Sequence, residues 1–374
     1  VVAAPMGMSD EITMWTSTQI PHILRLLIAL VTGIPENNLR VIAPDVGGGF
    51  GGKLQIYREE ILVAQLARKL GRPVKWTETR SENMVNMVQG RAQQQTVRIG
   101  GTAEGDITHY ALHVVQDSGA YVDVGAVLPM LTMMMAPGTY DIPNLQYSSQ
   151  SVFTNTTPVG AFRGAGRPEA AAAIERSVDL FAAEVRLAPE VVRRKNLLPA
   201  FNETHINVFG AAYDCGNFPA ALETVLEAAG YDELRAEQER RRDAGERKML
   251  GIGLASYVEI TAIDFSGAGV SEYARVEIKP DGSVIAWTGS TPQGQGHETA
   301  WAMIVADQLG VPFDAVAVRF GDTDVVPTRN VTGGSRSAQV AGSAMVSASI
   351  HLVTSAMEHA AAVLEASIDD MIFD

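Results

Sequence analysis

Glycine is gathered into short clusters along this chain instead of being spread evenly. The clusters fall at residues 47–52, 160–166, 251–253, 294–296 and 333–334. Glycine adopts backbone conformations that a side chain forbids, and it lets a backbone approach a ligand closely. No fixed low-complexity period accompanies the clusters, which excludes collagen-like and linker sequences. The chain is therefore expected to fold into regular elements joined by ligand-binding loops.

The composition supports a folded protein with about two domains. The chain has 374 residues, of which 46% are hydrophobic and 19% charged, as in globular proteins. A net charge of −14 argues against nucleic acid or an anionic membrane as the main partner. Cys215 is the single cysteine, which excludes an internal disulfide and a cysteine-ligated cluster within this chain and fits a reducing cytoplasm. The longest apolar stretch, residues 23–34, is too short to span a bilayer.

Hydrophobic periodicity and turn signals predict a mixture of helices and strands. Helices are predicted at residues 20–32, 57–70, 168–185 and 297–309, in a charged stretch before residue 250, and from residue 339 onward. Strands are predicted at residues 39–43, 74–78, 96–100, 107–116, 273–278, 284–288 and 316–320. Leu62, Leu66 and Leu70 form the apolar face expected of the second helix. The fold class expected from this pattern is α+β.

Two distant segments resemble each other. Gly33, Pro35, Val41 and Asp45 recur as Gly310, Pro312, Val318 and Asp322, at one constant offset of 277 residues. In each copy a predicted helix ends at Gly-x-Pro, and a strand and then a loop follow. The match predicts two related helix–strand–loop units, one in each domain and both facing a shared ligand.

The charged stretch suggests where the domains divide. Residues 1–210 are predicted to form a first domain and residues 251–374 a second, joined by a charged helical linker at residues 211–250. A run such as residues 239–243 usually forms a solvated helix face. Because the glycine-rich loops come from both halves, the ligand is expected between two domains.

The first glycine cluster fits two nucleotide-binding patterns imperfectly. Residues 47–53 satisfy both the dinucleotide fingerprint Gly-x-Gly-x-x-Gly and the Walker A pattern Gly-x-x-x-x-Gly-Lys. Leu54 stands where Walker A requires Ser or Thr, and a full helix and strand precede the loop, unlike in a dinucleotide fold. The loop still exposes backbone N–H groups to an anionic or oxo-bearing ligand. A tight structural turn is the alternative.

A second loop carries arginine at the start of a helix. Phe162 and Arg163 lie in a small-residue segment, residues 161–167, just before Pro168. Helix N-termini attract anions, and arginine adds a permanent charge with a planar fork. The alternative is a surface arginine pair in a turn.

Two loops in the C-terminal half complete the candidate site. Gln293, Gly294, Gln295 and Gly296 lead to His297 at the start of a helix, and Asp322, Thr323, Gly334, Ser335 and Ser337 follow in the next loops. Glutamine amides offer donors and acceptors to a heterocycle or an oxo ligand. Trp301 replaces the second histidine of His-Glu-x-x-His, which excludes a zinc protease here. The serine segment lacks the Gly-x-Ser-x-Gly elbow of hydrolases.

Together, these loops resemble the large, molybdopterin-binding subunit of the xanthine oxidase family, with the greatest likeness to the carbon monoxide dehydrogenase large subunit. The resemblance covers nearly the whole chain. It implies two related mixed α/β domains of the aldehyde oxidase and xanthine dehydrogenase type. It also implies a molybdenum–molybdopterin cofactor, often in the cytosine dinucleotide form, held by its own dithiolene. The reaction implied is hydroxylation or oxidation of a small substrate, such as an aldehyde, an N-heterocycle or a CO-like molecule, with water as oxygen donor.

The resemblance also implies roles for individual residues. Gln19 and the backbone at Gly48, Gly49, Phe50 and Gly51 would lie near the metal oxo group. Arg163 would sit beside the substrate, and Phe162 would contact the cofactor. The cofactor would be held by Gln293, Gly294, Gln295, Gly296, His297, Asp322, Thr323, Gly334, Ser335 and Ser337. No protein side chain is expected to ligate the molybdenum.

The family further implies partners: an iron–sulfur small subunit, a flavoprotein medium subunit carrying FAD, and a dimer of heterotrimers in the cytoplasm. Gly164 stands where well-studied carbon monoxide oxidisers carry a cysteine, so the loop resembles the second form of that subunit. The catalytic glutamate of the family belongs to a later segment. The chain is therefore expected to be an internal fragment that is inactive alone. A P-loop or dinucleotide enzyme and a non-catalytic binding module remain alternatives.

Overall fold

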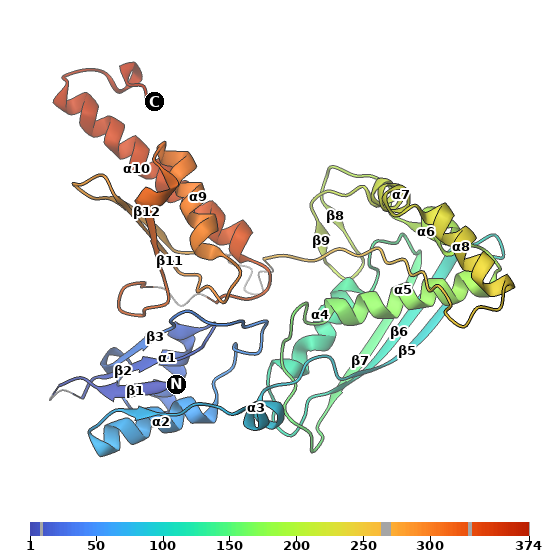
Figure 1. The fold of residues 1–374 in the computed structure, drawn as a ribbon, viewed down its shortest axis with the longest axis horizontal. Coiled ribbons are helices and arrows are strands. Elements are labelled where there is room, and N and C mark those ends of the chain that lie inside the picture. The colour runs from blue at the N-terminus through green and yellow to red at the C-terminus, as the bar shows by residue number, and fades with distance from the viewer. Residues whose placement is uncertain (8–9, 263–270, 328–330, 374) are drawn as a thin grey trace. The chain divides into compact units, whose positions relative to one another are not determined.

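The computed structural model describes residues 1–7, 10–262, 271–327 and 331–373. The chain forms two compact units (Figure 1). Unit 1 comprises Val1–Val85 and Thr261–Asp374, and unit 2 comprises Asn86–Ile260. Both units combine helices with sheets, which confirms the predicted α+β class.

The N-terminal half of unit 1 is a four-stranded sheet covered by two helices. Its elements are β1 (Val2–Pro5), β2 (Ile12–Trp15), α1 (Pro21–Thr32), β3 (Leu39–Ile42), α2 (Arg58–Leu70) and β4 (Val74–Lys75), followed by α3 (Arg80–Asn86). The strand order is β3-β2-β1-β4, and only the pairing of β2 with β3 is parallel. A core that includes Met14, Leu24, Ile28 and Val41 lies between sheet and helices.

The helix α2 forms where it was predicted, but it packs on another face. Leu62 and Leu70 are 57% and 50% exposed, whereas Val63, Ala64 and Ala67 are buried. The leucine spacing does predict one helix face. Small residues next to it face the sheet instead, because they let the helix approach β1 closely.

The C-terminal half of unit 1 repeats the same kind of arrangement. It contains β10 (Ala274–Ile278), β11 (Val284–Thr288), α9 (His297–Leu309) and β12 (Val316–Arg319), then a short π-helical turn (Ser337–Ala341) and α10 (Gly342–Val363). The sheet order is β10-β11-β12, with β11 and β12 parallel. Its core includes Ala286, Trp301, Val305 and Met345.

The two halves of unit 1 confirm the repeat predicted from the sequence. In each, an antiparallel strand pair is followed by a helix that crosses over to a parallel strand. Gly33 and Gly310 both end their helices in the left-handed conformation. A 3₁₀ turn, Glu36–Asn38 or Phe313–Ala315, then leads into the strand. Both copies lie in the same compact unit, unit 1.

The last strands of the two copies meet end to end. Ile42 forms an isolated antiparallel bridge with Asp322, and Ala43 N donates to Gly321 O at 2.8 Å. These contacts explain why the compact units differ from a linear division of the chain. The division at residues 210 and 250 stays a prediction about how the chain is partitioned among related domains.

Unit 2 is a three-stranded sheet with helices packed on it. The sheet contains β5 (Gln93–Gly101), β6 (Ile107–Asp117) and β7 (Asn144–Val152) in that order, with β5–β6 antiparallel and β6–β7 parallel. The helices are α4 (Leu128–Met135), α5 (Arg167–Glu184), α6 (Pro189–Asn196), α7 (Phe218–Ala229) and α8 (Tyr231–Asp243), and a short hairpin joins β8 (His205–Ile206) to β9 (Ala212–Tyr213). Tyr110, Leu112 and Val114 of the sheet pack against Ile174 and Val178 of α5.

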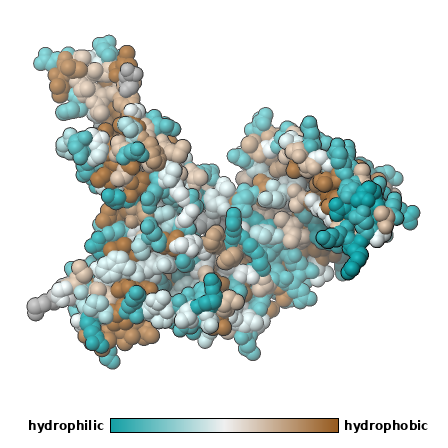
Figure 2. All heavy atoms as spheres, in the orientation of Figure 1, coloured by the Kyte–Doolittle hydropathy of each residue, from teal (hydrophilic) through white to brown (hydrophobic). Residues whose placement is uncertain are grey.

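The region predicted to link two domains belongs to unit 2. Leu222 and Leu226 of α7 join the core of that unit, which ties this helix to the sheet. Hydrophilic side chains gather over α8 (Figure 2), where Arg240 and Arg241 pair with Glu237. The charge run therefore forms a solvated helix face, as its composition predicts.

One helical stretch among the described residues has the length and apolar composition of a membrane span. It covers Ser337–Val363 and escapes a search for strongly apolar runs because it is rich in Ala and Ser. Core helices of soluble proteins have the same composition, and Met345 of this stretch packs in the core with Trp301. The absence of a membrane-spanning segment stays a prediction.

Candidate functional site

The glycine loop after β3 is held by one buried side chain, Gln19. Gln19 is 4% exposed, and its Oε1 accepts hydrogen bonds from Gly51 N at 3.0 Å and Lys53 N at 3.2 Å. Its backbone N donates to Lys53 O at 3.0 Å. The side chain fixes the loop by satisfying backbone donors that lie outside regular structure.

The same side chain explains why residue 49 is glycine. A Cβ at Gly49 would lie 2.6 Å from Gln19 Oε1 and 2.7 Å from its Cδ. Gly47 differs, because a Cβ there would meet no atom within 4 Å. The close packing of loop on glutamine is therefore specific to one position of the glycine run.

Gln19 also joins the glycine loop to the C-terminal half of unit 1. Gln19 Nε2 donates to Thr332 O at 2.6 Å, and Thr332 N donates to Gln19 O at 3.2 Å. Thr332 Oγ1 in turn accepts from Thr291 N at 2.7 Å. The loops at residues 47–53, 291–297 and 332–337 are thus connected through Gln19 and Thr332.

The glutamine-rich loop is organised by its own amides. Gln295 Oε1 accepts from Gln293 N at 2.5 Å, and Gln295 Nε2 donates to Gln293 Oε1 at 3.1 Å. Gly294 and Gly296 have φ angles of +98° and +79°, which glycine adopts without strain. The loop thus turns tightly and ends where α9 begins.

His297 is a buried, neutral imidazole at the first position of α9. It is 4% exposed, and burial lowers the pKa of its imidazole to about 4. Its ring lies 5.2 Å from that of Trp301, centroid to centroid. His297 Nδ1, Trp301 Nε1 and Thr291 Oγ1 are buried and have no hydrogen-bond partner within the described parts of the chain. Buried polar atoms without a partner need an explanation, and a bound water, ion or ligand supplies one.

Phe50 is presented to solvent at the tip of the glycine loop. Its φ is +55°, unusual for a residue with a side chain, and it is 57% exposed. The flanking Gly48 and Gly51 both have φ of +97°. A Cβ at Gly48 would lie 2.8 Å from the Phe50 ring, so glycine at position 48 makes room for that ring.

Asp322 and Thr323 hold the two sequence repeats together. Both oxygens of Asp322 bind Arg40, through Nε at 3.0 Å and Nη2 at 2.5 Å. Thr323 Oγ1 accepts from Val41 N at 2.9 Å, and Thr323 N donates to Val41 O at 3.1 Å. These side chains are occupied by structural contacts where the sequence indicated ligand contacts.

The serine segment lies at the surface of unit 1. Gly334 and Ser335 are exposed and have φ angles of +68° and +54°. Gly334 O accepts a hydrogen bond from Ala262 N at 3.2 Å. Ser337 opens the π-helical turn before α10. A left-handed Gly-Ser pair beside a helix start is a backbone shape that binds anions.

Phe162 and Arg163 belong to unit 2, and their loop is held by an arginine that the sequence did not single out. Arg91 Nη1 donates to Phe162 O at 3.0 Å and its Nη2 to Arg163 O at 2.6 Å. Glu169 Oε2 lies 3.5 Å from Arg91 Nη1 and accepts from Gly166 N at 2.9 Å. Glu169 thus caps α5, as expected of an acid at a helix start.

Sequence reasoning missed Arg91 and Thr291, which position the candidate residues. Thr291 gave no motif, since a lone threonine is ordinary in a loop. Arg91 follows Gly90, on which Phe162 packs so closely that a Cβ would lie 2.6 Å from its Cβ. Within the described residues, no group of three or more His, Cys, Asp or Glu side chains is placed to hold a metal ion.

Residues 1–197 and 224–374 both match the family described as the molybdopterin cofactor-binding domain. The carbon monoxide dehydrogenase large chain of Afipia carboxidovorans is 35% identical over 387 residues, covering 100% of this chain and 48% of the relative. The nicotine 6-hydroxylase large subunit of Paenarthrobacter nicotinovorans is 34% identical, covering 98% of this chain and 46% of the relative. The chain therefore spans about half the length of these curated relatives.

A solved structure matches the fold over the whole chain. The crystal structure of quinoline 2-oxidoreductase from Pseudomonas putida 86 superposes with a TM-score of 0.91 and 30% sequence identity. It covers 100% of this chain and 48% of its own chain.

Proposed function

The chain belongs to the molybdopterin cofactor-binding domain family, and we propose that it is the cofactor-binding part of a molybdenum hydroxylase acting on a small substrate. The observation that carries the proposal is the joining of the glycine loop, the glutamine loop and the serine segment through Gln19 and Thr332. These loops come from both sequence repeats. A cradle built from several loops suits a cofactor that is large and polar.

The donor set of these loops fits a pterin with a phosphate tail. His297 Nδ1 and Thr291 Oγ1 are buried and unpaired within the described residues. The glycine loop places backbone N–H groups and Phe50 at an exposed tip, and Gly334 and Ser335 offer a left-handed turn to an anion. When bound, the cofactor supplies a redox-active metal that its own dithiolene holds, so no cysteine or histidine ligand is needed.

Each candidate residue has a proposed task. Gln19 positions the glycine loop, and Gly48, Gly49, Phe50 and Gly51 face the metal end of the cofactor. Gln293, Gly294, Gln295, Gly296 and His297 line the pterin, and Asp322, Thr323, Ser335 and Ser337 line its tail. Gly334 lies under the metal. His297, being neutral, acts there through its Nδ1 and carries no charge.

Arg163 is proposed to bind the substrate and to stabilise negative charge that develops on it. Arg91 keeps the Arg163 backbone in place through its two hydrogen bonds. The proton acceptor expected of this chemistry is proposed to come from a segment outside residues 1–374. Glu169 is already engaged as a helix cap, which makes it a poor base.

The loop conformation favours an aldehyde or an N-heterocycle over carbon monoxide. Gly164 has a φ of +94°, and a Cβ there would lie 2.3 Å from Pro168 Cγ. A cysteine at this position therefore requires another loop conformation. The relatives named above act, by their names, on carbon monoxide and nicotine, and the solved structure on quinoline.

The resemblance of the loops also supports proposals for the cofactor form, the partner subunits and the assembly. We propose a cytosine dinucleotide form of the cofactor, an iron–sulfur subunit and a flavoprotein subunit with FAD, and a cytoplasmic dimer of heterotrimers. Two relatives carry "large chain" and "large subunit" in their names, which supports partner subunits. Among the alternatives, a P-loop is disfavoured because α2 begins only at Arg58, whereas a P-loop lysine opens its helix.

A pair of glycine variants tests the cofactor site. Gly49→Ala places a methyl group against Gln19 and displaces the side chain that joins the loops. Gly47→Ala is the matched control, because its Cβ meets nothing within 4 Å and its φ is not left-handed. Both proteins are produced in a host that makes molybdopterin, and molybdenum and pterin are measured per polypeptide.

We expect Gly49→Ala to lose most of the bound molybdenum and pterin while Gly47→Ala keeps both. Circular dichroism and a melting curve show whether each variant is folded. A folded Gly49→Ala protein with full cofactor content contradicts the proposed site.

A further inference from the structure

Residues 251–260 run beside α5 as extended chain that is not part of any sheet. No residue of this segment has a left-handed φ, and exposed and half-buried residues alternate along it. This period of two is the pattern of a β-strand with one face packed. Figure 1 draws the segment as a long coil without an arrow.

The even-numbered side chains anchor the segment in unit 2. Ile252 and Leu254 pack against the core between the sheet and α5. Val258 and Ile260 pack against a second cluster that includes Met135 and Ala170. The segment is therefore a fixed element of unit 2.

Three carbonyls along one edge of the segment accept hydrogen bonds from side chains of unit 2. Leu254 O accepts from Arg193 Nη2 at 2.8 Å, Ser256 O from Thr139 Oγ1 at 3.3 Å, and Ile260 O from Arg167 Nη2 at 2.8 Å. All three carbonyls belong to even-numbered residues. In extended chain, the N–H and C=O groups of one residue point to the same edge, and those of the next residue to the opposite edge.

The other edge carries backbone groups with no partner. Gly253, Ala255 and Tyr257 neither donate nor accept a backbone hydrogen bond within the described parts of the chain. Unpaired strand edges of this kind accept another strand, and proteins normally cover them. The backbone N–H and C=O groups of these three residues therefore have no backbone partner within the described residues.

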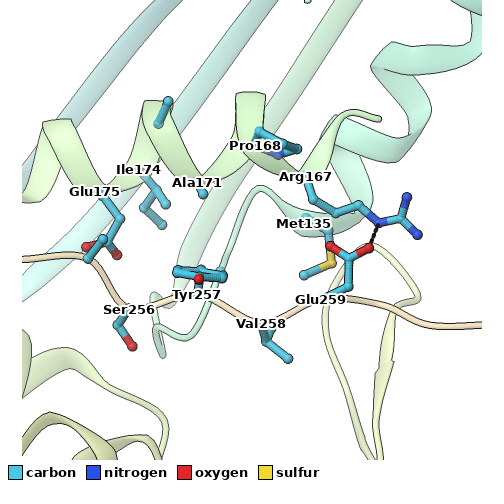
Figure 3. A pocket seen from close by; sticks show the side chains of 13 residues that line it. Met135, Arg167, Pro168, Ala171, Ile174, Glu175, Ser256, Tyr257, Val258 and Glu259 are labelled. Carbon is cyan, nitrogen blue, oxygen red and sulfur yellow. Dashed lines mark ion pairs between the residues drawn. The ribbon is translucent and has the colours of Figure 1, made fainter. Parts of the chain in front are cut away.

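An apolar cavity lies between this segment and α5 (Figure 3). It has a volume of about 410 Å³ and is lined by Pro168, Ala171 and Ala172 of α5 and by Met135, Tyr257 and Val258 among others. In Figure 3 the side chain of Glu259 rises from the segment toward Arg167, with which it forms an ion pair. The alanines leave room for a polypeptide backbone to approach the helix.

We propose that this edge docks one further β-strand of the same polypeptide, from outside residues 1–374. The strand hydrogen-bonds to Gly253, Ala255 and Tyr257 and places apolar side chains in the cavity beside α5. Backbone pairing along an edge, with alternate side chains in a pocket, is the ordinary mode of strand addition. The relatives are about twice as long as the region they share with this chain, so proteins of this type have further chain from which such a strand can come.

Hydrogen–deuterium exchange with single-residue resolution tests the proposal. Exchange is compared between the chain of residues 1–374 and the protein produced from its complete gene. We expect the amides of Gly253, Ala255 and Tyr257 to exchange roughly tenfold or more slowly in the complete protein. The amides of Leu254 and Ser256, on the anchored edge, are expected to change little.

A pair of variants on α5 locates the docking surface. Ala172→Trp fills the cavity from an exposed position, and Ala183→Trp is the control at an exposed position of the same helix outside the cavity. We expect Ala172→Trp to abolish the added protection in the complete protein and Ala183→Trp to preserve it. Urea unfolding of both variants as the 1–374 chain checks that the helix itself is intact.

Three results overturn the proposal. The first is equal exchange of the three amides in the short and the complete protein. The second is protection that appears only when separate subunits are added to the complete polypeptide. The third is slowing of odd and even amides alike, which indicates general covering and not pairing along one edge.

Discussion

Acidification should destabilise unit 1 through His297. Burial lowers the pKa of this imidazole from its ordinary 6.5 to about 4, and the N-terminus of α9 is an unfavourable place for a cation. Below pH 6.5 the His297 imidazole binds a proton in the unfolded chain, whereas in the folded protein it stays neutral down to a pH of about 4. The stability that neutral His297 contributes is therefore present above pH 6.5 and is lost as the pH falls toward about 4.

The size of the effect follows from the two pKa values. One pKa unit corresponds to about 1.4 kcal/mol. Between pH 6.5 and pH 5 the imidazole is mostly protonated in the unfolded chain and mostly neutral in the folded protein, so most of this interval lowers the unfolding free energy. Between pH 7 and pH 5 the loss attributable to His297 is about 2 kcal/mol. His297→Phe keeps an aromatic ring against Trp301 but cannot titrate. It should lack this part of the pH dependence.

The assay is urea unfolding of wild type and His297→Phe, without added cofactor, at intervals from pH 8 to pH 5. We expect the difference in unfolding free energy between the two proteins to change by about 2 kcal/mol across this range, in favour of the variant at low pH. An NMR titration of the His297 ring measures its pKa directly. Parallel pH profiles for the two proteins would refute the reasoning, as would a measured pKa near 6.5.

Two further substitutions test individual residues. Gln19→Leu leaves Gly51 N, Lys53 N and Thr332 O without their partner. We therefore expect a loss of about 2–4 kcal/mol in unfolding free energy and weaker cofactor retention. An unchanged urea midpoint would contradict the role of Gln19 in holding the glycine loop. Arg163→Lys keeps the charge but loses the planar fork, so in the active complex we expect lower kcat/KM at an unchanged melting temperature. Loss of folding, with normal specific activity in what remains, would show that Arg163 is structural.

Much of the fold was predictable because its signals are local. Gly33 and Gly310 end their helices in the left-handed conformation, which favours glycine. Their constant spacing from matching residues in the sequence is enough to predict the repeat. The face of α2 was not predictable in the same way. Leucine is the more apolar choice, but whether Leu62 or Ala64 faces β1 depends on how closely the helix approaches the sheet.

The candidate site shows where sequence reasoning stops. The glycine loop, the glutamine loop and the serine segment stand out in the sequence because their composition is unusual. These three loops do meet in unit 1. The hydrogen bonds that join them connect residues far apart in sequence, such as Gln19 with Thr332, and common side chains make them. Asp322 is a further example, since its ion pair with Arg40, on a strand of the other repeat, leaves no local signal in the sequence.

The bridge between Ile42 and Asp322 also sets an order of events during synthesis. Unit 2 is one continuous stretch and can fold as soon as the ribosome releases it, whereas unit 1 must wait for its second half. At about 5–20 residues per second, the chain between these two residues takes roughly 15–55 s to emerge. The first repeat spends that time with β3 unpaired at its outer edge, and the loops that join through Gln19 and Thr332 come together last.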